Sequence, residues 1–102
     1  MEDTIKRVKE MERILGEQND LLEKVNKVID EFDSKRGEYI KLRDYYSSQE
    51  YFDDLKLDKE GKFPKDMTTG VFSEDLVYNL LGEYFNTGVK MCESGLDAIK
   101  KY

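Results

Sequence analysis

The sequence predicts an all-α fold: a small helical bundle in which a long N-terminal helix is hairpinned onto a second helix and a C-terminal helix completes a three-helix core. Apolar residues repeat at helical spacing through the first third of the chain, a helix-start signature stands at residues 73–75, and the only proline lies with two glycines in one segment. With 102 residues, 38% of them hydrophobic, we expect a single domain over 1–102 with a modest core.

The first helix is predicted over about 3–35 from a heptad pattern. Gln18 takes the one position in it where an apolar residue is missing, and the apolar members are Val8, Met11, Leu15, Leu22, Val25, Ile29 and Phe32. Ile14, Leu21 and Val28 lie beside this row and widen it to a face, as is typical of a helix with two neighbours.

Gly37 follows Lys35 and Arg36, which predicts a left-handed cap and a turn into an antiparallel second helix. A first helix of that length extends about 50 Å at ~1.5 Å per residue. It therefore overhangs a compact globule of this size, so we expect either an elongated hairpin or a second subunit that covers the overhang.

The middle of the chain is predicted as a second helix over about 38–47, a short helix over 48–57 and a Gly/Pro loop over 58–72. Ser47 with Glu50 three residues later has the form of a capping box, which restarts the helix at Ser48. The loop contains Gly61, Pro64 and Gly70.

The last helix is predicted over about 74–93. Ser73 is the expected N-cap, Glu74 and Asp75 lie where the helix dipole favours negative charge, and Phe72 is placed to contact Val77. Ser94 and Gly95 predict a break before a short tail over 95–102.

Composition removes most catalytic and metal chemistry. The chain has no His, and Cys92 is its only cysteine, so we expect no enzyme, no catalytic residue, no cofactor and no metal site. A lone Cys on an apolar stripe is more often a small packing residue than a reactive thiol. An acidic chain without disulfides, signal peptide or membrane span is expected in the cytoplasm and away from membranes.

Acidic and aromatic residues are interleaved between Asp44 and Glu60, and exposed aromatics beside charge are typical of protein-recognition surfaces. The candidate partner-binding residues are Tyr45, Tyr46, Glu50, Tyr51, Phe52, Asp53 and Asp54. The alternative is that the aromatics face the core and the acids form its solvated side. An EF-hand is excluded because Lys56 and Met67 occupy its first and last ligand positions, which leaves an adventitious divalent cation as a minor possibility.

A second set of residues is interpreted as structural. Asn79 is predicted to anchor the Gly61–Gly70 loop by hydrogen bonds, so that the loop folds over the start of the last helix. Adjacent acids such as Glu74 and Asp75 diverge by about 100° on a helix, which argues against a catalytic carboxylate pair. The structural candidates are Gly61, Pro64, Gly70, Ser73, Asp75, Tyr78 and Asn79.

Residues 45–84 resemble the signature region of the small bacterial DUF4298 family. The resemblance rests on Tyr45 and Tyr46, on Ser48, Glu50 and Tyr51, on Gly61 to Pro64, on Gly70 to Asp75, and on Tyr78 to Leu81. Tyr51 and Phe72 depart from the commoner Trp and Leu of that pattern, and Met67 to Thr69 replace more basic residues, which argues against a basic anion pocket. The resemblance implies a small, helical, cytoplasmic bacterial protein and supplies no activity.

Three functional hypotheses remain at this point. The first is a non-enzymatic module that binds another protein or itself, including a homodimer through helix 1, by its heptad face or the acidic-aromatic segment. The second is an acidic decoy that mimics DNA and blocks a nucleic-acid-binding protein; the formal charge of -6 suits it, whereas 17 basic residues count against it. The third is an enzyme that uses only Asp, Glu, Tyr and Lys. Direct nucleic-acid binding is not expected, because no cluster of Lys and Arg occurs.

Overall fold

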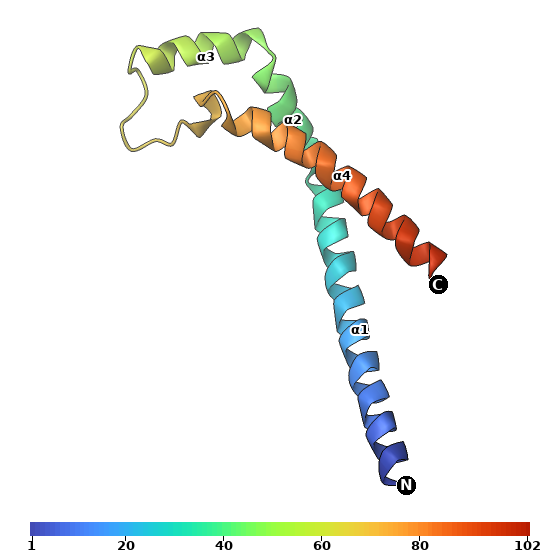
Figure 1. Ribbon diagram of the computed structural model, residues 1–102. Helices are drawn as coiled ribbons and strands as arrows, with labels where there is room; N and C mark the ends of the chain where they lie inside the picture. Colours follow the sequence, from blue (N-terminus) through green and yellow to red (C-terminus); the bar gives the residue numbers. More distant parts are fainter. The chain divides into compact units, whose positions relative to one another are not determined.

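The computed structural model describes all 102 residues and contains four α-helices, one 3-10 turn and no strand (Figure 1). The all-α prediction is therefore confirmed. The elements are α1 (Glu2–Ser34), α2 (Arg36–Tyr46), α3 (Gln49–Lys59), η1 (Gly70–Phe72) and α4 (Leu76–Lys100). The chain divides into two compact units, Met1–Tyr39 and Ile40–Tyr102, and α2 runs from the first into the second.

Helix α1 covers 33 residues, and its bounds agree with the predicted 3–35 to within one residue. Charged side chains one turn apart pair along its surface, as Arg13 does with Glu10 and with Glu17, the latter at 2.9 Å. The Arg13 guanidinium holds the pKa of the Glu10 carboxyl below its usual value. No residue of α1 is buried, so this helix rests on local interactions rather than on a core of its own unit.

The break between α1 and α2 is a single residue, Lys35, whose backbone keeps a right-handed conformation (φ -92°, ψ 0°). Its N–H donates to the Glu31 carbonyl, and its carbonyl accepts from the N–H of Tyr39. The predicted left-handed cap at Gly37 is wrong: Gly37 lies inside α2, and Gly61 is the only residue with positive φ. One residue of near-helical backbone does not provide the loop that the predicted hairpin turn at Gly37 requires.

Helix α3 has well-defined caps at both ends. Its N-cap is Ser48, whose hydroxyl oxygen accepts from the Tyr51 N–H at 3.2 Å, so the predicted capping box on Ser47 is wrong by one residue. At the C-terminus Gly61 adopts φ +69°, its N–H donates to the Asp58 carbonyl, and the Lys62 N–H donates to the Leu57 carbonyl. This pair of bonds is a Schellman motif, which satisfies the last carbonyls of α3.

The Gly/Pro loop was predicted in the correct part of the chain. Figure 1 shows it leaving α3 and coming back, so that η1 lies beside α3 before α4 begins. The predicted N-cap at Ser73 is wrong: Ser73 is extended after η1, and α4 starts at Leu76 behind Asp75, whose side chain makes no capping bond. The reason is η1 itself, since the Ser73 N–H donates to the Gly70 carbonyl and belongs to that turn.

Helix α4 continues to Lys100, so the predicted break at Ser94 and Gly95 does not occur. A glycine inside a helix costs only about 1 kcal/mol, and the hydrogen-bond ladder passes over it. Two residues are buried in the structure, Tyr51 at 8% and Val77 at 4% exposure, and both lie in the second unit. No helix is long and apolar enough to cross a membrane.

Candidate functional site

An aromatic cluster surrounds Tyr51 and forms the centre of the second unit. The Tyr51 ring lies 5.7 Å from that of Tyr45, 5.2 Å from Tyr46 and 6.0 Å from Phe72, between ring centroids. Phe72 in turn stacks on Phe63 at 5.7 Å. Edge-to-face and tilted contacts at these distances are favourable, so the cluster joins α2, α3, the loop and η1.

Tyr45 links this cluster to the acidic segment. Its hydroxyl donates a 2.7 Å hydrogen bond to Oδ2 of Asp54. Burial of the phenol, followed by the bond to Asp54 and that carboxylate's charge, raises the pKa of Tyr45 to about 12. Burial also raises the pKa of Tyr51. Both groups therefore remain neutral at physiological pH.

The candidate partner-binding residues fall into a covered group and an exposed group. Tyr51 is buried, and Tyr45, Tyr46 and Asp54 are half-buried, so these four side chains belong mainly to the cluster. Phe52 is 58% exposed, although its ring contacts Tyr51 edge-on at 5.6 Å. Including Tyr51 in a partner surface was wrong, because its ring is already covered by the chain's own aromatics.

Most of the acids of this segment lie on the outside, although Asp54 and Asp58 are half-buried. Glu50 and Asp53 are exposed, and the Asp53 carboxylate accepts a 3.0 Å hydrogen bond from the Gln49 amide one turn earlier. Asp44 pairs with Arg43 at 3.2 Å. The arrangement corresponds to the alternative interpretation, aromatics inward and acids in solvent, with two exceptions: Phe52 is exposed, and Asp54 is half-buried and bonded to Tyr45.

Sequence reasoning missed Phe63 and Phe72 as members of the cluster. Phe63 precedes Pro64 in the loop, and Phe72 was assigned only a contact with Val77. Their packing depends on the path of the loop between α3 and η1, which no local pattern encodes. The sequence offered one signal for this packing: the Gly/Pro segment has an aromatic residue, Phe63 or Phe72, near each of its ends.

The structural candidates have mixed outcomes. Gly61 is favoured by its positive φ, whereas at Gly70 an added Cβ would lie 3.2 Å from Cδ1 of Leu76, the end of an exposed side chain. Pro64 lies in the loop, where its carbonyl accepts from the Met67 N–H. The predicted anchor at Asn79 is wrong, because this side chain is exposed and makes no hydrogen bond to the loop.

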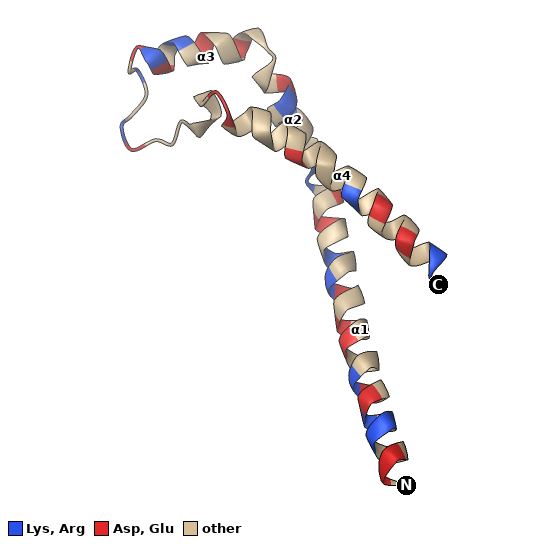
Figure 2. Ribbon diagram, viewed as in Figure 1, with Lys and Arg blue, Asp and Glu red and all other residues tan.

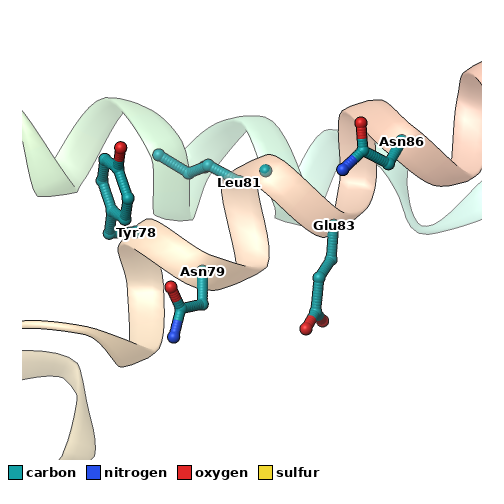
Figure 3. Close-up of a pocket in the computed structure, with 6 residues that line it drawn as sticks. Tyr78, Asn79, Leu81, Glu83 and Asn86 are labelled. Carbon is teal, nitrogen blue, oxygen red and sulfur yellow. The ribbon is translucent and has the colours of Figure 1, made fainter.

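Asn79 instead borders a shallow hollow on α4 (Figure 3), which is lined by Tyr78, Asn79, Leu81, Gly82, Glu83 and Asn86. Gly82 leaves the surface open there, since nothing lies within 4 Å of an added Cβ. Figure 3 shows Asn79 and Glu83 extending away from Tyr78 and Leu81. The polar side chains that line the hollow therefore do not converge on one point.

The largest feature without a partner in its own unit is the apolar face of α1. We define the α1 apolar face as Val8, Met11, Ile14, Leu15, Leu21, Leu22, Val25 and Val28. All eight side chains are exposed, from 36% at Ile14 to 62% at Val28. Beyond Val25, Ile29 and Phe32 of the heptad row are half-buried. Soluble monomers rarely expose a continuous apolar surface of this length.

The rest of α1 is mostly polar, and many of its residues are charged. Figure 2 shows Lys and Arg alternating with Asp and Glu along the helix. The ion pairs of Arg13 and the 2.9 Å pair of Arg36 with Asp33 lie among them. A mixed-charge surface beside a continuous apolar face is the pattern of a helix that binds other helices.

Helix α4 also carries exposed apolar side chains. Tyr78 is 68% exposed, Phe85 72% and Ile99 74%, and Cys92 is exposed among them. The expectation that Cys92 serves as a packing residue is therefore wrong for this structure.

Comparison with known proteins gives one family. A family model described as a domain of unknown function (DUF4298) matches residues 8–94, which includes the α1 apolar face and the aromatic cluster. The searches of curated proteins and of solved structures found no match.

Proposed function

Because the chain belongs to the DUF4298 family, a domain of unknown function, we propose its role from the geometry alone: it is a non-enzymatic interaction module that binds a helical partner through the α1 apolar face. The observation that carries the proposal is the exposure of all eight members of that face on a helix with no buried residue. Burying aliphatic side chains is the main favourable term in helix association, at roughly 25 cal/mol per Å² of apolar surface.

The shape of the face suits a helix as the partner. The stripe runs from Val8 to Val28 and is about 30 Å long at ~1.5 Å per residue. Its side chains recur at the heptad spacing that lets knobs of one helix enter holes of another. A second helix laid along α1 covers such a stripe, whereas a loop or a sheet edge does not match its period.

The aromatic cluster supports the same choice by exclusion. The rings of Tyr51 and its neighbours pack against one another inside the second unit, so they leave little apolar surface for a partner to contact. Phe52 is the one strongly exposed ring among the candidate residues there.

The alternative function, an acidic inhibitor that imitates DNA, has no specific observation in its favour. Such a surface needs acids spaced like phosphates and free of nearby bases. Figure 2 shows bases interspersed with the acids, and several acids are paired with Arg or Lys.

Site-specific photo-crosslinking tests the proposal. A photoreactive phenylalanine analogue replaces Leu21, at the edge of the α1 apolar face, or Glu23, on the polar side as a matched control. Irradiation of cells that express the full chain is expected to give a discrete adduct from position 21 and none from position 23. Equal adducts from both positions, or none from position 21, would refute a binding role for this face.

A further inference from the structure

We propose that the partner is a second copy of this chain, with the two α1 helices antiparallel and Val8 of one copy opposite Val25 of the other. This inference rests on the proposed function and specifies the occupant of the α1 apolar face. It comes from three properties of α1: the chemistry of its two flanks, the extent of its exposed row, and the position of Gln18.

The two flanks of the heptad row differ in chemistry. One flank carries the aliphatic side chains of Ile14, Leu21 and Val28, which are 36–62% exposed. Between Val8 and Val28 the other flank carries Glu12 and the amides of Asn19 and Asn26, and Ile5 precedes them in the same row. An identical helix can therefore approach in two ways that give different contacts.

Antiparallel pairing brings like flanks together, because reversing one helix places the same side of each against the other. The aliphatic flanks of both copies then meet on one side of the pair and the polar flanks meet on the other. Parallel pairing instead places Leu21 of one copy against Asn26 of the other, and Ile14 against Asn19, on both sides. Parallel pairing thus sets the aliphatic side chains against amides, one of which already donates to the Leu22 carbonyl of its own helix, whereas antiparallel pairing buries the aliphatic side chains against one another and is favoured.

The register follows from where the exposed row begins and ends. The row is exposed from Val8, at 52%, to Val25, at 45%, whereas Ile29 beyond it is half-buried. An antiparallel pair covers this stretch completely only when its two-fold axis passes the middle of it, next to Gly16. That register places Val8 opposite Val25, Met11 opposite Leu22 and Leu15 opposite Gln18 of the second copy.

This register also gives Gln18 a partner. Gln18 is the one polar residue in the row, and burying its amide without hydrogen bonds is unfavourable. Next to the two-fold axis, the two copies of Gln18 occupy adjacent layers, offset by about 4.5 Å along the helix at ~1.5 Å per residue. Long amide side chains at that offset can hydrogen-bond to each other, and such a buried polar pair fixes one register.

The test uses single cysteines in the full chain with Cys92→Ser, because the native thiol is exposed. Val8→Cys and Val25→Cys are prepared separately, mixed in equal amounts and equilibrated in a glutathione redox buffer. The matched control is the pair Lys6→Cys and Lys27→Cys, which lies at the same height on the opposite, polar side of α1. Light scattering coupled to gel filtration reports the mass of the wild-type chain in parallel.

The expected result is a disulfide-linked dimer from the Val8 and Val25 mixture, at least about tenfold more abundant than from either variant alone or from the control pair, because neighbouring thiols reach millimolar effective concentration. Self-linkage of Val8→Cys alone would overturn the inference in favour of a parallel pair while leaving the proposed function intact. A monomeric mass at every concentration would overturn self-association, and the photo-crosslinking result would then decide whether a different protein occupies the face.

Discussion

The two units of this chain handle their apolar residues in opposite ways. In the second unit, rings from α2, α3, the loop and η1 gather around Tyr51 and cover it. In the first unit, α1 carries eight apolar side chains in one stripe and buries none of them. The difference shows that apolar residues are covered by their own unit in one region and stay exposed in the other.

The sharpest test of this contrast is Tyr51→Ala. Removing a buried aromatic leaves a cavity, and we expect the free energy of unfolding to fall by about 3–5 kcal/mol, measured by urea denaturation with circular dichroism. Phe52→Ala, one residue away but 58% exposed, is the control and should cost clearly less. Equal losses for the two variants would mean that the cluster is not the stabilising centre of its unit.

A pH titration tests the same cluster through the ionisation of Tyr45. The pKa of Tyr45 is raised to about 12, above the value near 10 of an unfolded tyrosine, so the folded state holds the proton more tightly. Stability is then fully present below pH 10 and falls as the pH rises from 10 towards 12. Tyrosinate absorbance should show this late ionisation, and denaturation midpoints should decline over the same range.

Tyr45→Phe is the matching variant for that titration. It should remove the late-ionising group and make the loss of stability above pH 10 shallower. It also deletes the bond to Asp54, at a cost of about 1 kcal/mol at neutral pH. An unchanged tyrosinate titration would contradict the assignment of the raised pKa to Tyr45.

Two glycine substitutions should have opposite signs in the two units. Gly61→Ala forces a side chain into φ +69° at the end of α3, and we expect a loss of about 1 kcal/mol. Gly16→Ala lies in open space within α1 and should stabilise that helix by roughly 0.5–1 kcal/mol. Thermal denaturation followed by circular dichroism measures both, and unchanged or increased stability of Gly61→Ala would disprove the Schellman cap.

The smallest effect is expected for Leu22→Ala at concentrations low enough to keep the chain monomeric. Leu22 is 59% exposed, so its truncation should change the free energy of unfolding by about 0.5 kcal/mol or less. A loss as large as that of Tyr51→Ala would show that α1 is covered within the monomer. That outcome would remove the contrast between the two units.

Local patterns predicted much of the secondary structure. The heptad row located α1, the serine pair placed the start of α3 within one residue, and the glycines and proline marked the loop. These elements are set by contacts within one or two turns, which the sequence displays directly. The residues that failed, Gly37, Ser73 and Gly95, are all weak terminators whose local preference was overridden by continuing backbone hydrogen bonds or by η1.

The candidate site was less predictable. The interleaved rings of 45–52 were visible in the sequence, but whether they face inward depends on Phe63 and Phe72, which reach them only through the loop. The α1 apolar face was visible as a pattern, whereas its exposure required the structure. Periodicity shows which residues share a side of a helix and does not show what lies against that side.

The ring contacts of the aromatic cluster also bear on how quickly the second unit forms. The ring contact between Tyr51 and Phe72 spans 21 positions of the chain, whereas the other contacts of the cluster join neighbours on α2 and α3 or close the loop. Closing a segment of about 20 residues costs little chain entropy, and chains dominated by such short-range contacts fold in microseconds to milliseconds. We therefore expect Tyr51 to be covered early in folding, whereas the leucines of α1 stay exposed after the second unit has formed.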